Sequence, residues 1–112
     1  MKRLYTKSES EIQRDICAFL TNLGIEHTVS DASLNHWRHR RSMKKAWPDI
    51  TAILPPNGQV WAIEVKTARG EYRPGQKEQL ERIHAKGGKI TTARCLDDVL
   101  RDWQEYLRGI GK

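Results

Sequence analysis

The sequence predicts a small α/β domain in which helices flank a small mixed central sheet. Three observations lead to this prediction: apolar residues at helical spacing near both ends of the chain, short apolar runs with strand character in the middle, and a helical segment between the last two of these runs. The 112 residues are the length of one domain, which we expect to span residues 1–112. A hydrophobic content of 38% with 30% charged residues favours a folded protein over a disordered one.

The first helix is expected over residues 8–23. Ser8 and Glu11 have the spacing of a capping box, and Gly24 follows the last apolar position as a helix-ending residue. The apolar residues that recur at helical spacing are Ile12, Ile16, Phe19, Leu20 and Leu23.

Three strands are expected next. Residues 25–29 form a short candidate, and residues 49–54 and 59–67 form two longer ones. The Pro-Pro-Asn-Gly sequence at 55–58 predicts a turn that joins the longer strands into a hairpin. Residues 30–46 are polar and basic without a clear period, which predicts a loop or irregular arm.

The C-terminal part alternates helix and strand. A helix that opens at Pro74 or Gly75 is expected to run to about Lys86, where two glycines stop it. Residues 89–93 form the fourth predicted strand. The apolar residues that mark a final helix are Leu96, Val99, Leu100, Trp103 and Leu107, of which Trp103 and its neighbour Tyr106 are expected to make core or dimer contacts.

The hairpin places three charged side chains on one face. Glu64 and Lys66 share a face because strand side chains alternate with period two. A symmetric four-residue turn pairs Asp49 with Glu64, whereas a tight turn at Asn57-Gly58 pairs Asp49 with Lys66. The tight turn would put Pro56 into the ladder without an N–H donor, so we expect the first register. In either register Asp49 lies on the same face as the other two.

Two carboxylates in directly opposed positions, with Cβ atoms about 4.5–5.5 Å apart, repel unless a cation or a proton lies between them. Mg²⁺ suits such a pair because it binds one or two carboxylates together with water and phosphate. The amine of Lys66 could then stabilise charge that develops on a phosphate or orient a water. The alternative, which these three residues leave about equally open, is the solvated polar face of an ordinary hairpin.

Two flanking helices add polar side chains that point toward the sheet. Glu9 shares the apolar face of the first helix with Ile16, and Gln13 lies on the same side. Gln76 shares a face of the second helix with Leu80 and would put an amide toward the core. For Glu9 the alternative is an acid in the first turn of the helix, where the helix dipole favours negative charge. For Gln76 the alternative is a partly exposed residue of the first turn.

A net charge of +6 favours a polyanionic partner such as nucleic acid. A basic segment lies just before Asp49, and Trp37 within it could stack on an exposed base. The alternative for this segment is a solvated loop. The basic residues that we expect to contact DNA are Arg38, Arg40, Arg41, Lys44 and Lys45, with Arg69 and Arg73 as weaker candidates.

Several other classes are disfavoured. No apolar run approaches the roughly 18 residues of a membrane span, and the N-terminus lacks a secretory signal, so we expect a cytoplasmic protein without a membrane partner. Cys17 and Cys95 cannot form a disulfide framework, and we expect Cys95 to be at least partly buried. His36 and His39 lack further ligands at zinc spacing. No phosphate-cradling glycine loop stands out, and we expect no organic cofactor.

Taken together, the site residues resemble the PD-(D/E)XK nuclease superfamily, and in particular its VRR-NUC family (virus-type replication-repair nucleases) in the short standalone form of phages and bacteria. The resemblance extends from Glu9 to about Leu107. The helix-one glutamate and the glutamine after it match Glu9 and Gln13, and the Pro-Asp pair matches Pro48-Asp49. The Glu-x-Lys motif matches Glu64-Val65-Lys66, and the helix glutamine matches Gln76. Ala46 stands where the family usually has glycine.

The resemblance implies a restriction-endonuclease-like core and a Mg²⁺- or Mn²⁺-dependent endonuclease that hydrolyses phosphodiester bonds in DNA. It implies that Glu9, Asp49, Glu64 and the backbone carbonyl of Val65 hold the metal, and that Lys66 orients or activates the attacking water. Gln76 is implied to belong to the catalytic group and Gln13 to lie near the DNA. Short members are implied to be homodimers that cut branched DNA such as Holliday junctions. The alternatives are a nicking endonuclease without junction preference and a basic DNA-binding module without catalysis.

Overall fold

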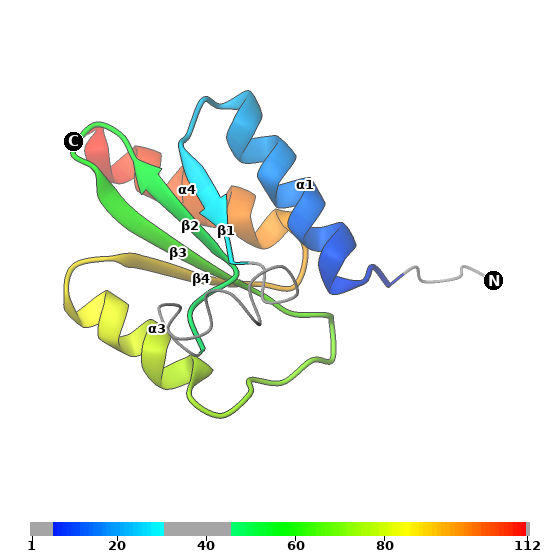
Figure 1. Ribbon diagram of the computed structural model, residues 1–112. Helices are drawn as coiled ribbons and strands as arrows, with labels where there is room; N and C mark the ends of the chain where they lie inside the picture. Colours follow the sequence, from blue (N-terminus) through cyan, green and yellow to red (C-terminus); the bar gives the residue numbers. More distant parts are fainter. Residues whose placement is uncertain (1–5, 31–45, 112) are drawn as a thin grey trace.

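The computed structural model describes residues 6–30 and 46–111, and the order of its elements agrees with the prediction (Figure 1). The predicted basic segment lies largely outside these residues. The elements are α1 (Glu9–Asn22), β1 (His27–Val29), β2 (Ile50–Leu54), β3 (Gln59–Val65), α3 (Gln76–Ala85), β4 (Lys89–Ala93) and α4 (Leu96–Ile110).

The strands form one mixed sheet in the order β1-β2-β3-β4. The pairs β1–β2 and β2–β3 are antiparallel, whereas β3 and β4 are parallel. A parallel pair needs a crossover connection, and α3 with its flanking loops supplies it. The sheet therefore brings the C-terminal ends of β3 and β4 together, at the end of the molecule where α1 begins (Figure 1).

The hairpin adopts the expected register. Ile50 pairs with Ile63 and Leu54 with Gln59, which leaves a four-residue turn between the strands. The N–H of Gly58 donates to the carbonyl of Leu54 at 2.8 Å, and the φ of +78° at Gly58 favours glycine there. Continuing this register by one residue sets Asp49 opposite Glu64.

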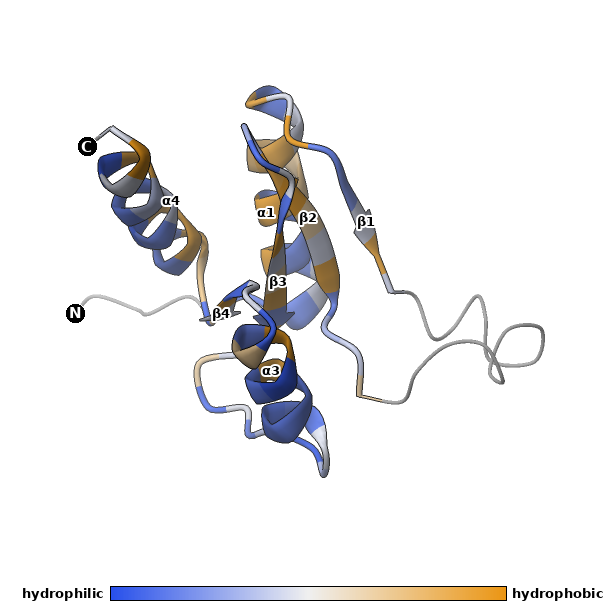
Figure 2. Cartoon of the chain, turned by 90° about the vertical axis from the view of Figure 1, so that its left-hand side faces the viewer, coloured by the Kyte–Doolittle hydropathy of each residue, from blue (hydrophilic) through white to orange (hydrophobic). Residues whose placement is uncertain are grey.

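The apolar core lies between the sheet and helices α1 and α4. The capping box predicted at Ser8 and Glu11 is present at the start of α1. In Figure 2, hydrophobic colour follows β2, β3 and parts of α1 and α4, while α3 is mostly hydrophilic with a small hydrophobic part. Trp103 of α4 stacks on Trp61, with ring centroids 6.4 Å apart, and on Tyr106, so it packs against the core as a partly buried residue. The fully buried core includes Ile12, Ile16, Leu20, Ile50, Leu54, Trp61, Ile63, Val65 and Val99.

The ends of several elements differ from the prediction by a few residues. The strand expected to reach Thr67 ends at Val65, because the chain turns there and the carbonyl of Thr67 accepts from Gly70 N–H at 3.1 Å. The final helix extends to Ile110. Cys95 is exposed rather than partly buried, because it caps α4 at the surface.

None of the helices in the described residues is long and apolar enough to cross a membrane.

Candidate active site

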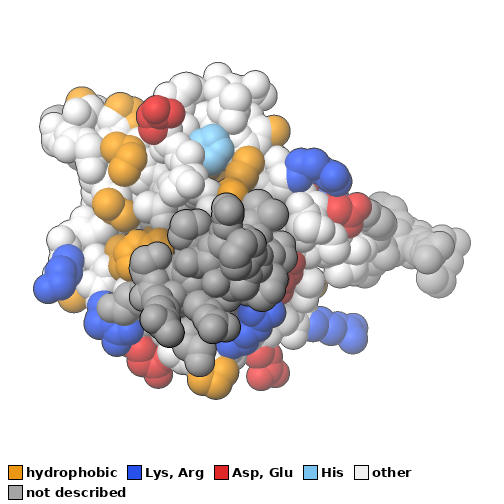
Figure 3. Space-filling model, viewed as in Figure 1, with side chains coloured by type: hydrophobic (Ala, Val, Ile, Leu, Met, Phe, Trp, Pro, Cys, Tyr) orange, Lys and Arg blue, Asp and Glu red, His pale blue; other side chains and the backbone are white. Residues whose placement is uncertain are grey.

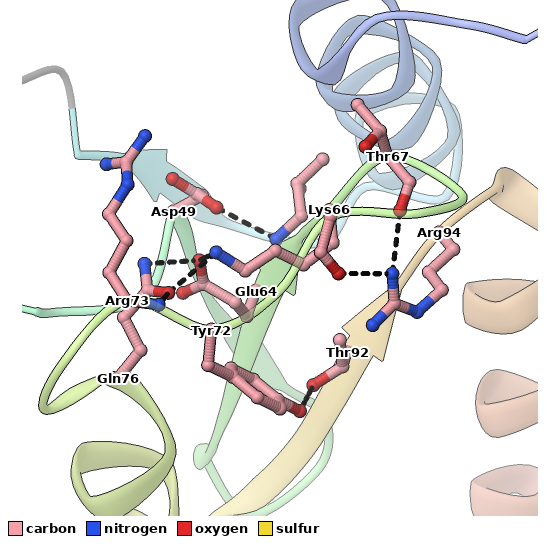
Figure 4. Close-up of polar contacts among 11 residues, drawn as sticks. Asp49, Glu64, Lys66, Thr67, Tyr72, Arg73, Gln76, Thr92 and Arg94 are labelled. Atoms are coloured by element: carbon pink, nitrogen blue, oxygen red, sulfur yellow. Dashed lines mark hydrogen bonds and ion pairs between the residues drawn. The ribbon is translucent and has the colours of Figure 1, made fainter.

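Asp49 and Glu64 lie on the same face of the hairpin, as the register requires (Figure 4). Asp49 directly precedes β2, and its Oδ2 accepts a hydrogen bond from the backbone N–H of Val65 at 2.8 Å. This bond ties the carboxylate to the end of β3. The face opposite the apolar core thus carries two acids on neighbouring strands.

Glu64, Lys66 and Gln76 form a buried polar network on this face (Figure 4). The ammonium of Lys66 donates to Oε1 of Gln76 at 2.6 Å and lies 3.6 Å from Oε2 of Glu64. The amide of Gln76 donates to the same Glu64 oxygen at 2.9 Å. The exposed fractions of Glu64, Lys66 and Gln76 are only 2%, 3% and 8%, so water is largely excluded from these charges. Both ends of the Gln76 amide are therefore used inside the site, and the partly exposed alternative for this residue is wrong.

The carboxyl group of Glu64 is in an unfavourable place for a negative charge. Burial is the largest cause that raises its pKa, to about 8, and the nearby carboxylate of Asp49 is the second. Lys66 lowers the pKa, but its effect is smaller. The other Glu64 oxygen, Oε1, is buried and has no hydrogen-bond partner. A buried acceptor without a partner costs roughly 1–3 kcal/mol, so the site favours a proton or a cation at this oxygen.

The residues at the start of α3 hold the side chain of Gln76 toward the sheet. Gly75 caps the helix with a φ of +89°, which glycine adopts without strain. The backbone N–H of Arg73 donates to Oε1 of Gln76 at 2.6 Å. One amide oxygen thus accepts from both the loop backbone and Lys66, and it links the loop to the charged cluster.

Replacement of Gln76 by Leu should destabilise the protein strongly. The buried amine of Lys66 and the buried Oε2 of Glu64 would each lose a partner where water has little access. The N–H of Arg73 would also lose its acceptor in the loop. We expect a loss of about 2–4 kcal/mol in the free energy of unfolding, measured by denaturant titration.

The matched control is Gln79→Leu, the same change one helical turn further along. Gln79 is also buried, but its side chain accepts one hydrogen bond, from Arg82, at 3.0 Å. Gln79→Leu should therefore lower the free energy of unfolding distinctly less than Gln76→Leu. An equal loss in the two variants would contradict the central role of the Gln76 amide.

Three further residues border the site that the sequence reasoning missed. The ring of Tyr72 lies 5.9 Å from the ammonium of Lys66, and its hydroxyl contacts Oγ1 of Thr92 at 2.5 Å. Arg94 binds the loop after Lys66 through several carbonyls. Strand alternation, combined with the pairing of Glu64 with Thr92, could have placed Thr92 on this face, but the sequence alone gave no strand pairing for β4.

Glu9 and Gln13 lie in the first turns of α1 and are partly buried. The start of α1 lies at the same end of the sheet as the C-terminal end of β3 (Figure 1), which carries Glu64. Within residues 6–30 and 46–111, however, no three acidic, histidine or cysteine side chains come close enough to form a metal site by themselves. The part of Glu9 in metal binding therefore stays a prediction, as does that of Gln13 in DNA binding.

Of the predicted DNA-contacting residues, Arg69 and Arg73 are exposed in the loop between β3 and α3. Trp37, Arg38, Arg40, Arg41, Lys44 and Lys45 lie outside the described residues. On the face seen in Figure 3, the described Lys and Arg side chains are scattered among acids and do not form one continuous basic surface.

Comparisons with known proteins agree with this architecture. No family model matches the chain, and no curated protein matches it. A solved structure described as a "VRR_NUC domain protein" has a TM-score of 0.70 and 21% sequence identity, and the match covers 94% of this chain and 92% of that one. A second, described as "VRR_NUC domain", has a TM-score of 0.69 and 21% identity and covers 88% of this chain and 96% of that one. The chain therefore has the fold of the VRR-NUC domain, which confirms the predicted α/β core with its small mixed sheet.

Proposed function

We propose that the protein is a metal-dependent endonuclease that hydrolyses phosphodiester bonds in DNA. The observation that carries this proposal is the cluster of Asp49, Glu64 and Lys66 on one largely buried face. Two acids beside an amine, with one acid oxygen left without a partner, suit a divalent cation and a phosphate better than they suit an inert protein surface. The fold shared with VRR-NUC domains supports the same function.

The residues present fit a Mg²⁺ or Mn²⁺ ion. Asp49 and Glu64 would supply carboxylate oxygens, and the carbonyl of Val65 a further oxygen, which are the ligands that Mg²⁺ prefers. Oε1 of Glu64 is the oxygen with no partner, and Asp49 is already held by the end of β3. Glu9 at the start of α1 is the proposed additional ligand. When bound, such an ion supplies Lewis-acid polarisation of a phosphate oxygen.

The remaining steps fall to side chains of this chain. Lys66 is held by Gln76, so its ammonium is ready to orient a water molecule and to offset the negative charge that builds up on the phosphate during attack. Because the site is shielded from solvent, this electrostatic effect is larger than it would be at the surface. Gln76 keeps the amine in place and is part of the catalytic group in this sense.

The substrate is proposed to be DNA, and branched DNA in particular. The net charge of +6 and the basic run before Asp49 support a nucleic-acid partner. The preference for junctions and a homodimeric state rest on the resemblance to short VRR-NUC members. A dimer suits a two-fold junction, because two symmetric sites can make two symmetric cuts. The cytoplasm of a bacterium or of a phage-infected cell is the proposed location.

Labelled four-way junction, linear duplex and single strand, each with Mg²⁺ or with EDTA, test this function. We expect cutting of the junction that needs Mg²⁺. Equal cutting of all substrates would favour the general endonuclease instead. Binding without cutting in both Mg²⁺ and Mn²⁺ would favour the non-catalytic DNA-binding module.

A separate prediction concerns the basic segment. Replacing Arg38, Arg40 and Arg41 with Ala should weaken DNA binding and flatten its dependence on salt. The slope of log K against log salt should fall by about 2 to 3, since each lost phosphate contact contributes about 0.9. The control replaces three exposed arginines of α3 and α4, namely Arg82, Arg101 and Arg108. If both triple variants change the slope equally, the segment has no special part in binding.

A further inference from the structure

Arg94, just after β4, holds the loop that follows Lys66. Its Nη1 donates to the carbonyls of Thr67 and Gly70, each at 2.7 Å, and lies 3.4 Å from that of Ala68 (Figure 4). The backbone N–H of Arg94 is itself fixed by Oδ2 of Asp98 at 2.9 Å. The turn is closed by the hydrogen bond from Gly70 N–H to the carbonyl of Thr67, and the guanidinium adds further hydrogen bonds to its carbonyls from outside the turn.

The same turn packs directly on Lys66. Gly70 lies so close that a Cβ built on it would be 3.0 Å from Oγ1 of Thr67 and 3.7 Å from Cβ of Lys66. The backbone N–H of Lys66 donates to the carbonyl of Ala93, the residue before Arg94. The backbone of Lys66 is therefore enclosed between the end of β4 and the turn that Arg94 holds.

A second contact connects this loop to β4. The hydroxyl of Tyr72 bonds to Thr92, and the Tyr72 ring lies 5.9 Å from the ammonium of Lys66. Tyr72 is 38% exposed, whereas Lys66 is 3% exposed. The loop thus covers the amine, and Thr92 and Arg94 anchor it at two points.

We propose that Arg94 is a positioning residue: by binding the carbonyls of Thr67 and Gly70 it keeps the ammonium of Lys66 beside Glu64 and Gln76. The catalytic consequence rests on the proposed nuclease function, but the placement of Lys66 does not. A displacement of about 1 Å at a reacting group can lower a rate on the order of 100-fold, so a loosened turn is expected to act on catalysis more than on substrate binding.

The test compares Arg94→Met, which keeps an unbranched apolar stem but removes the guanidinium donors, with Arg94→Lys, which keeps a cation that can donate to carbonyls. Gly70→Ala disturbs the same turn from the other side. Arg108→Ala, an exposed arginine near the far end of α4, controls for the loss of charge. Steady-state cleavage gives kcat and KM, and the rate at which an amine-acylating reagent modifies Lys66, followed by peptide mass spectrometry, reports its shielding without any activity.

For Arg94→Met and Gly70→Ala we expect kcat to fall by roughly 10-fold or more with KM within about 2-fold, and Lys66 to be acylated roughly 10-fold faster. Arg94→Lys should recover most of both effects, and Arg108→Ala should show neither. If the wild type cuts no DNA but Arg94→Met still exposes Lys66, the nuclease function fails while the positioning role stands. Unchanged acylation of Lys66 in Arg94→Met overturns the inference. Amide hydrogen exchange of the same variant, followed by mass spectrometry, separates local from general loosening, and an equal rise in α1 and in the loop also overturns it.

Discussion

Lys66→Met should lower the rate of DNA cleavage by roughly 1,000-fold or more while binding of DNA changes by less than about 3-fold. The methionine keeps much of the side-chain volume but removes the ammonium that lies between Gln76 and Glu64. Because Lys66 is only 3% exposed, its ammonium contributes little to binding the phosphates along the DNA backbone. Its charge acts at the phosphate that is being cleaved. Single-turnover cleavage and binding in Ca²⁺ measure the two effects separately.

The matched control for this variant is Lys77→Met. Lys77 is exposed on α3, next to Gln76, so its loss removes the same charge from the nearby surface without touching the network. It should leave cleavage nearly unchanged. Cleavage that survives in Lys66→Met, or that drops equally in both variants, would remove the catalytic role of Lys66.

Glu64→Gln should abolish cleavage and also change how stability depends on pH. The pKa of Glu64 is about 8 in the folded protein, chiefly because of burial and then Asp49, and returns to an ordinary value near 4.5 on unfolding. Between these two values the folded state holds a proton that the unfolded state releases, so the free energy of unfolding falls as pH rises. Each unit of difference is worth about 1.4 kcal/mol.

Metal-free wild-type protein should therefore melt at a Tm roughly 10 °C lower at pH 8 than at pH 5. Gln resembles the protonated acid and does not titrate, so Glu64→Gln should lose most of this fall and melt above the wild type at pH 8. Asp49→Asn should reduce the fall in part, because it removes one of the two causes of the raised pKa. Other titrating groups cancel in the comparison between variants.

A divalent cation should have the opposite effect to alkaline pH. The ion competes with the proton for Glu64, so Mg²⁺ should raise the Tm of the wild type at pH 8 more than at pH 5. The Tm of Glu64→Gln should respond far less to Mg²⁺. If the two proteins respond equally to pH and to Mg²⁺, the buried acid does not behave as the geometry requires.

The hairpin illustrates what the sequence could predict. Pro56 decided between two registers, because a proline cannot donate in the ladder, and the choice placed Asp49 opposite Glu64. The capping box at Ser8 and the turns at glycines likewise depend on residues only a few positions apart, so the sequence predicts them. Alternation alone put Lys66 on the correct face. These features involve residues that are close in sequence or joined by a short turn.

The missed features depend on contacts between distant segments. The pairing of β3 with β4 crosses a helix, so nothing in the sequence placed Thr92 or Arg94 beside the loop after Lys66. Tyr72 was not singled out, because an aromatic residue in a loop has no period to interpret. The network through Gln76 was anticipated only as an amide pointing inward, and its three partners follow from the way α3 packs against the end of β3.

A crystal structure of the protein grown with Mn²⁺, with the ion located by its anomalous scattering, tests the cation pocket most directly. We predict a peak in contact with the carboxylates of Asp49 and Glu64 and with the carbonyl oxygen of Val65, and no such peak in crystals of Glu64→Gln. A well-ordered pair of carboxylates without an ion, or a peak that persists in Glu64→Gln, would contradict the account.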